Sequence, residues 1–502
     1  MANTFYRPIV VSLAVGLLAT ACTVGPNYKK PPVTVPPAFK EAAPPAVVAA
    51  AASQLAPAQP RDAVARGKWW ETFGDGQLNG LEEQVAVSNQ TIAQAEARFR
   101  AARAAVLGAR SGQFPTVTAG AATTRSRASS SRSIVRQTLP GLTVTDYQLP
   151  IDASWEVDLW GRVRRGVESS VATAQASAAD VATAILSMQS DLALDYFQMR
   201  GLDAEKQLLD STVDGYGKAL QLTILRHNQG VSSGVDVAQA ETQVATVRAQ
   251  STDLGVSRAQ FEHAIAVLTG RPPSAFTLAA SDAGILPPAI PVALPAQLLE
   301  RRPDVAAAER SVAAANAQIG VAKAAYFPTL SLTASGGFES AAISTLLSWP
   351  SRFWSLGPSL VQTLVDGGKR RAATEQATFA WEETVAAYRQ SVLGAFQDVE
   401  DNLAALRILA QEASEQAAAV AAAERSLDLA NSRYQGGITT YLEVITAQTA
   451  ALANQRTAIE LLTRRMTASV LLVKALGGGW NVTDLPSPRV IVADQRGAAI
   501  QK

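Results

Sequence analysis

Two kinds of hydrophobic pattern recur along this chain of 502 residues. From Tyr147 to Val157, apolar and polar side chains alternate without interruption, which predicts a strand with one apolar and one polar face. A run of about 11 residues is the length of a strand that crosses a membrane. A weaker alternation over 354–364, with Gln362 on its apolar side, and shorter runs beginning at Val117 and Leu330 bring the predicted strands to four.

The longest segments follow helical periodicity instead. Apolar side chains recur there at steps of three and four, which predicts coiled-coil seams. They are Val181, Ile185, Met188, Leu192, Tyr196 and Met199 in one segment, and Val385, Tyr388, Val392, Phe396, Val399, Leu403 and Leu406 in the other. As one helix, the stretch from Gly166 to Gly230 would measure roughly 96 Å at 1.5 Å per residue. Two shorter helices, broken near Gly201 or Gly215, are the alternative.

The chain repeats itself. The turn Arg226–Ser233 returns as Arg433–Thr440, so that Gly230 and Gly437 lie 207 residues apart. Phe114-Pro115-Thr116 returns as Phe327-Pro328-Thr329 at an offset of 213. A repeat of this length indicates a duplicated unit, in which a helix, two strands, a long helix, a tight turn and a helix follow one another.

These patterns divide the chain into six parts. They are a signal peptide (1–21), a lipidated N-terminal tether (22–66), repeat 1 (67–270), a linker (271–297), repeat 2 (298–480) and a C-terminal tail (481–502). The apolar run Ile9–Leu18 is typical of a signal peptide, because it is too short to span a membrane. Cys22 follows it directly and resembles the acylated cysteine of bacterial lipoproteins, which carries diacylglycerol and palmitate. An ordinary secretory signal is the alternative.

The strand count has a consequence for assembly. Four strands cannot close a barrel, and open strand edges cannot exist in lipid. Since small membrane barrels need about eight strands or more, the chain is expected to oligomerise. Three copies would supply twelve strands. The predicted fold is therefore a mixed α and β membrane protein, in which a trimer forms a 12-stranded β-barrel on an α-helical barrel.

Composition and motifs exclude several functions. The net charge of +1 gives no electrostatic case for binding nucleic acid. Gly230–Gly234 matches the G-x-S-x-G motif of hydrolases, but that motif requires a strand before the serine, and here both flanks are helical. The only histidines are His227 and His263, and no cluster suggests a metal. We therefore expect no catalytic activity, metal or cofactor beyond the lipid on Cys22.

Several stretches together resemble the outer-membrane efflux proteins, specifically the lipoprotein branch that includes nodulation-protein-T-like and multidrug channels. They extend from Cys22 to Trp480. The stretches are Cys22–Tyr28, Trp69-Trp70 with Phe73, Asp75, Leu78 and Asn89, Arg301–Val305 with Ala308-Glu309, Phe327-Pro328, and Ala475–Trp480.

The resemblance implies a homotrimer in the outer membrane, lipid-anchored and spanning, with a helical tunnel that extends into the periplasm. Its implied partners are outer-membrane lipid, a periplasmic adaptor and an inner-membrane pump, expected to be proton-driven. The chain would be the passive exit duct for small molecules such as drugs. Two alternatives stay open: a channel for ATP-driven peptide or protein secretion, and a periplasmic coiled-coil lipoprotein that forms no channel.

The resemblance also assigns residues at the tips of the helices. The turns that match the adaptor-docking positions are Gln229, Gly230, Val231 and Ser232 in repeat 1, and Gly436, Gly437, Ile438 and Thr439 in repeat 2. A purely conformational role of the glycines is the alternative. Asp236 and Glu443 occupy equivalent positions, where helix-start acids explain them without a role in the pore. His227 could sense pH, or it could simply be a solvated turn residue.

Tyr441 and Leu442 match the positions that narrow the closed end of the channel. The aspartate and arginine that lock the tip in well-known members are replaced here by Thr446 and Thr449. The hypothesis is that an apolar ring of Leu442, supported by Tyr441 and neutral hydrogen bonds, holds the periplasmic gate closed.

Overall fold

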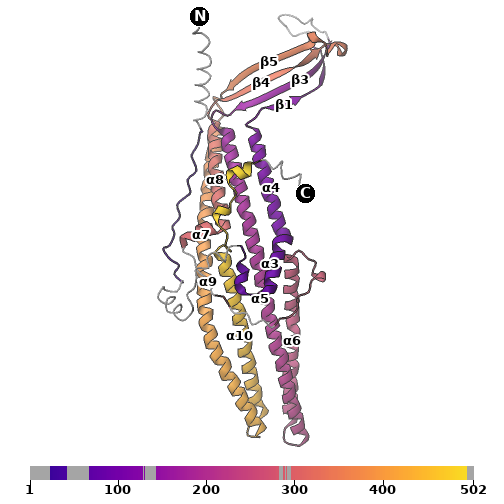
Figure 1. The fold of residues 1–502 in the computed structure, drawn as a ribbon, viewed down its shortest axis with the longest axis vertical. Coiled ribbons are helices and arrows are strands. Elements are labelled where there is room, and N and C mark those ends of the chain that lie inside the picture. The colour runs from indigo at the N-terminus through magenta and orange to yellow at the C-terminus, as the bar shows by residue number, and fades with distance from the viewer. Residues whose placement is uncertain are drawn as a thin grey trace.

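The computed structural model describes residues 23–41, 67–127, 129, 143–281, 287–288, 290 and 295–493. The predicted signal peptide, Cys22, most of the tether and the end of the C-terminal tail lie outside these residues. The molecule is a long bundle of helices with a sheet at one end (Figure 1). Within the described residues, no helix is both long and apolar enough to cross a membrane.

The two repeats fold alike. Repeat 1 contains η1 (Trp69–Phe73), α3 (Gly76–Ser88), α4 (Gln90–Ser111), β1 (Thr116–Ala119), β2 (Ala122–Arg127), β3 (Thr143–Val157), α5 (Arg162–Asn228) and α6 (Gly234–Leu268). Repeat 2 contains α7 (Pro295–Arg301), α8 (Pro303–Ala324), β4 (Thr329–Ser340), β5 (Arg352–Val361), α9 (Lys369–Gln435) and α10 (Tyr441–Ala475). The short helices η2 (Pro273–Ala275), η3 (Ile343–Thr345), η4 (Trp349–Ser351), η5 (Val482–Asp484) and α11 (Pro488–Val492) lie in the connections and the tail.

The long helices are continuous. Both α5 and α9 contain 67 residues, and both α6 and α10 contain 35. The alternative of a break near Gly201 or Gly215 is therefore excluded. Gly201 has a packing role instead, because a Cβ at this position would lie 2.3 Å from Oγ1 of Thr463 on α10. Glycine lets the helices of the two repeats approach closely at this point.

The strands form one antiparallel sheet in the order β1-β3-β4-β5, with β2 also paired to β3. The predicted first strand is split into β1 and β2 opposite Pro150, which has no N–H to continue the ladder. The prediction for the fourth strand was too long, since β5 ends at Val361. Gln362 therefore lies outside the strand, and its amide donates to the carbonyl of Tyr326 at 3.1 Å.

The register sorts the side chains of this sheet onto two faces. Residues directly opposite each other share a face, and Ile151, Ala153 and Trp155 of β3 face the same way. The residues paired with them on β1 and β4 are mostly apolar, and so are the β5 residues paired with that part of β4. The apolar residues on this face include Val117, Ala119, Leu332, Ala334, Leu356 and Pro358. The opposite face carries polar residues such as Asp152, Ser154, Ser335 and Ser355. We call these the apolar face and the polar face.

The beginning of the predicted tether packs on the helices as an extended strap, residues 23–41. Phe39 is buried and contacts Phe396 edge-on, with ring centroids 6.5 Å apart. One turn further along α9, the carboxylate of Glu400 accepts hydrogen bonds from the backbone N–H groups of Lys40 at 2.7 Å and Glu41 at 3.0 Å. The strap is therefore part of the folded body.

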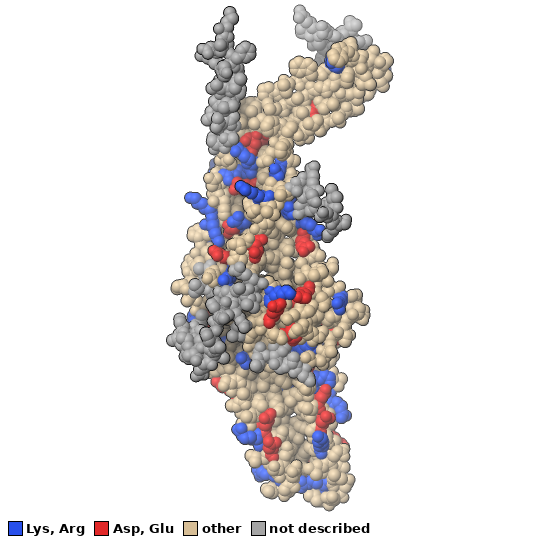
Figure 2. Space-filling view, in the orientation of Figure 1, with Lys and Arg blue, Asp and Glu red and all other residues tan. Residues whose placement is uncertain are grey.

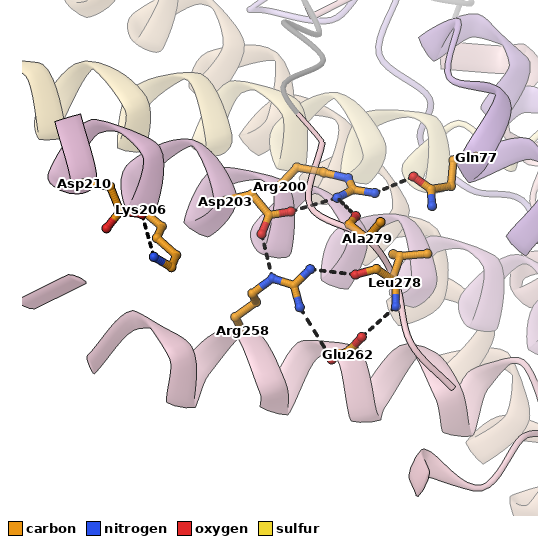
Figure 3. Close-up of polar contacts among 9 residues, drawn as sticks. All are labelled: Gln77, Arg200, Asp203, Lys206, Asp210, Arg258, Glu262, Leu278 and Ala279. Atoms are coloured by element: carbon orange, nitrogen blue, oxygen red, sulfur yellow. Dashed lines mark hydrogen bonds and ion pairs between the residues drawn. The ribbon is translucent and has the colours of Figure 1, made fainter. Parts of the chain in front are cut away.

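A buried polar network joins the hairpin of repeat 1 to the chain that leaves it (Figure 3). Asp203 on α5 accepts from Arg200 at 2.8 Å and from Arg258 of α6 at 2.7 Å. The same two arginines donate to the carbonyls of Ala279 at 2.9 Å and Leu278 at 2.7 Å. We call this set the equatorial network. It fixes the start of the linker against α5 and α6.

Candidate functional site

The two helical hairpins end in turns of the same geometry at the end of the bundle far from the sheet (Figure 1). In repeat 1 the N–H of Val231 donates to the carbonyl of Arg226 at 2.8 Å, and in repeat 2 the N–H of Ile438 donates to the carbonyl of Arg433 at 2.9 Å. Gly230 and Gly437 have φ of 75° and 72°, a backbone conformation that suits glycine.

Each turn exposes one aliphatic side chain at its tip. Val231 is 63% exposed and Ile438 is 72% exposed. The other predicted docking residues lie in the same turns, and Ser232 and Thr439 are half-buried while Gln229, Gly230, Gly436 and Gly437 are exposed. The turns thus present polar backbone around an apolar knob. Both the conformational role of the glycines and a docking role fit this arrangement.

A contact between the repeats joins the two tips within one protomer. The guanidinium of Arg226 lies over the ring of Tyr434, 4.6 Å from its centroid, and donates to the Tyr434 carbonyl at 2.6 Å. The Tyr434 hydroxyl lies 3.4 Å from Oγ1 of Thr223 and 3.3 Å from Oγ of Ser232. We call these four residues the tip clasp. It holds the end of α5 against the end of α9.

Tyr441, one of the predicted gate residues, lies at the start of α10. This residue is 1% exposed and packs inside the protomer, with its ring 5.3 Å from that of Tyr434. Burial raises the pKa of its hydroxyl to about 12. A side chain enclosed between the two hairpins supports the tip clasp from within.

The other predicted gate residues share one exposed face of α10. Leu442 is 58% exposed, and Thr446 and Thr449 follow it at steps of four and three. The threonine hydroxyls donate to the carbonyls of Leu442 and Ile445 in their own helix, both at 2.9 Å. Because both hydroxyls are bonded within their own helix, Leu442 is the residue of this face that could form an apolar constriction.

The acids and the histidine near the tips have local roles. Asp236 forms a capping box with Ser233 at the start of α6, as expected of a helix-start acid. The Glu443 carboxylate forms an ion pair with the Arg433 guanidinium, with 3.6 Å between Oε2 and Nη1. His227 contacts the carbonyl of Ser232 through Nδ1 at 2.9 Å. Ser232 itself lies in a turn between two helices, and among the described residues no group of three or more His, Cys, Asp or Glu could hold a metal.

The tip clasp was not predicted from the sequence, although the sequence contains one signal for it. Tyr434 occupies the repeat position of His227, and the two residues lie 207 apart. Arg226 and Arg433 are equivalent in the same way. The clasp therefore pairs a residue that the two repeats share, Arg226, with one that they do not share, Tyr434.

The chain thus combines two antiparallel helical hairpins with an antiparallel sheet that has one apolar face. The profile of the outer membrane efflux protein family matches residues 81–271 and 294–478. The chain belongs to this family, as the resemblance of its motifs indicated.

Curated relatives and solved structures agree with this assignment. The pyoverdine export outer membrane protein OpmQ of Pseudomonas aeruginosa is 33% identical over 416 residues, which cover 82% of this chain and 87% of the relative. The toluene efflux pump outer membrane protein TtgF of Pseudomonas putida is 30% identical and covers 95% of this chain and 98% of its own. The structure of the outer-membrane channel OprN matches with a TM-score of 0.81 and 30% identity, covering 91% of this chain and all of that one.

Proposed function

We propose that this chain is the outer-membrane channel subunit of a tripartite efflux system, a passive exit duct for small molecules and not an enzyme. The observation that carries the proposal is the two-faced sheet joined to two long hairpins. An apolar face suits lipid and a polar face suits a water-filled interior. The names of the relatives, which refer to pyoverdine export and toluene efflux, support small molecules as cargo.

The proposed assembly is a homotrimer. β5 has a single neighbour in the described sheet, and on the other side β1 and β2 pair only with β3. Unpaired strand edges are costly in lipid, so the edges of one copy are proposed to pair with those of the next. Three copies would close a barrel of twelve strands, with the helices forming a tunnel through the periplasm.

The proposed lipid anchor on Cys22 has structural support from the residues that follow it. The N–H of Val24 donates to the carbonyl of Trp160 at 3.0 Å, between β3 and α5. Thr23 packs against Gly161, where a Cβ would lie 2.8 Å from the threonine methyl. The chain is thus held at the boundary between sheet and helices, where a membrane around the sheet would end. Acyl chains on the preceding residue could enter that membrane.

The tips are the proposed docking site for a periplasmic adaptor, which would connect the channel to an inner-membrane pump. A photo-crosslinker placed at Ser233 or Thr440 in living cells tests this, with Lys369 at the other end of α9 as the control site. We expect both tip sites to capture an adaptor associated with a proton-driven pump. Capture of an adaptor with an ATP-driven transporter would support secretion instead, and no capture from either tip would overturn the docking proposal.

The proposed closure of the periplasmic end rests on Leu442 and the tip clasp. Replacing Leu442 by serine is expected to raise the single-channel conductance of the reconstituted trimer at least about twofold, because a hydrophobic constriction excludes water. Single-channel recording in planar bilayers measures this, and an unchanged conductance would sink the idea of an apolar ring.

The clasp provides an internal comparison. Arg226→Gln removes the stacked guanidinium and should raise the conductance in the same direction. Arg433→Gln, at the equivalent position of repeat 2, removes only the exposed pair with Glu443 and should leave the conductance unchanged. If neither substitution changed the conductance, the closure would be assigned to Leu442 alone. If both raised it equally, the clasp would have no special part in the closure.

A further inference from the structure

The arginines of the sheet gather on one face. β1–β5 contain Arg125 and Arg127 on β2 and Arg352 on β5. Arg125 and Arg127 lie opposite Thr145 and Thr143, which alternate in phase with Ile151 on β3, and Arg352 lies opposite Phe338, the partner of Leu149. All three guanidiniums therefore project from the apolar face.

The acids of the same strands lie on the other face. They are Asp146, Asp152 and Glu156 on β3 and Glu339 on β4. Asp146 is opposite Thr124 and Glu339 is opposite Gln148, both in the register of the polar face. Charge is thus fully sorted between the faces of the five strands. Such sorting is not needed for strand pairing, so it points to different surroundings on the two sides.

The three arginines also share one end of the sheet. Arg125 and Arg127 end β2 and Arg352 begins β5, at the end far from the helices (Figure 1). Figure 2 shows blue atoms at this end, while the visible surface of the sheet is otherwise almost free of charge. Trp349 and Trp354 are exposed beside them, and the Arg352 guanidinium lies over the Trp349 ring. Tryptophan at such a border is typical of the membrane interface.

The position of the arginines fits an anionic layer. On a lipid-facing surface an arginine costs about 2–4 kcal/mol at the bilayer midplane and about 0–1 kcal/mol near the interface. None of the three has a carboxylate partner within the described part of the chain. A guanidinium binds phosphate oxygens through two parallel hydrogen bonds. Three of them at one rim suit the phosphate groups of lipid headgroups.

We propose that Arg125, Arg127 and Arg352 form a basic rim that binds the phosphate groups of glycolipids in the outer leaflet of the membrane. The inference rests on the proposed placement of the sheet in the outer membrane, with the helices on the periplasmic side. Bound lipid would fix the depth of the barrel in the membrane.

The test uses the purified full-length trimer in detergent and native mass spectrometry to count bound lipid. The probes are diphosphoryl lipid A and its dephosphorylated form. The wild type is compared with the triple variant Arg125→Gln, Arg127→Gln, Arg352→Gln. A control triple variant, Arg248→Gln, Arg389→Gln, Arg425→Gln, removes the same charge from exposed sites on α6 and α9.

We expect the wild type and the control to bind the phosphorylated lipid at least about tenfold more tightly than the dephosphorylated one, and the rim variant to lose this preference. The lysine versions of the three rim residues should retain most of it, because the charge remains. A rim variant that keeps the preference while its trimers conduct would overturn the inference alone. A wild type that neither trimerises nor conducts would overturn the proposed function, and the rim with it.

Discussion

Replacing Asp203 by alanine is expected to lower the local unfolding free energy of the α5–α6 hairpin near the linker by about 3–5 kcal/mol, the cost of removing one partner from a buried ion pair. The Asp203 side chain is 3% exposed and lies between two arginines. Without it, Arg200 and Arg258 would face each other with no carboxylate between them. Hydrogen exchange of the amides in α5, α6 and residues 276–281 measures the change.

Asp210 provides the matched control on the same helix. It pairs with Lys206 at 2.6 Å, and both side chains are about half exposed (Figure 3). Asp210 also accepts a hydrogen bond from the Ser251 hydroxyl at 2.5 Å. Because exposed pairs contribute only about 0–1 kcal/mol, Asp210→Ala should change hydrogen exchange clearly less than Asp203→Ala. Equal effects of the two substitutions would show that the equatorial network is solvated and contributes no more to stability than an exposed ion pair.

Glu82 on α3 is expected to make the protein less stable as the pH rises. The residue is 0% exposed and neither carboxylate oxygen has a hydrogen-bond partner in the described structure. Burial raises the pKa of this carboxyl from 4.5 to about 9. The folded state therefore keeps a proton that the unfolded state releases, and stability falls by about 1.4 kcal/mol per pH unit within this window.

Replacing Glu82 by glutamine removes the titrating group and should flatten this dependence. Relative to the wild type, the variant should become increasingly more stable as the pH rises from 5 to 8, as measured by denaturant midpoints of the purified protein. Glu83→Gln is the control, since Glu83 is exposed and paired with Lys68 at 2.5 Å. Parallel pH profiles for the wild type and the Glu82 variant would mean that this carboxyl is ionised in the assembled protein.

Motifs that recur at a fixed offset predicted the repeat, and local periodicity predicted where the strands lie. The alternation over Tyr147–Val157 predicted which face of the sheet each side chain occupies, because a strand with one apolar face pairs correctly in only one register. The structure extends that strand to Thr143, where threonine and valine alternate with little contrast in polarity. The split between β1 and β2 was missed because it depends on Pro150 of a neighbouring strand.

Contacts between distant segments explain what the sequence could not predict. The burial of Tyr441 depends on the packing of α9 against α10, and the tip clasp joins residues 208 apart in the chain. The strap was predicted as an extended tether because its proline-rich sequence shows no period. Its hydrogen bonds to Glu400 come from the backbone and leave no mark in the sequence. The gate and docking assignments themselves remain predictions.

The equal lengths of the hairpins and the unequal residues at their tips have a consequence for any partner. In the proposed trimer, six tips would form a ring in which turns that expose Gln229 and Val231 alternate with turns that expose Gly436 and Ile438. A ring of six identical partner molecules would then contact two chemically different kinds of binding site. Half of its members should bind with one affinity and half with another, so that the complex fills in two stages.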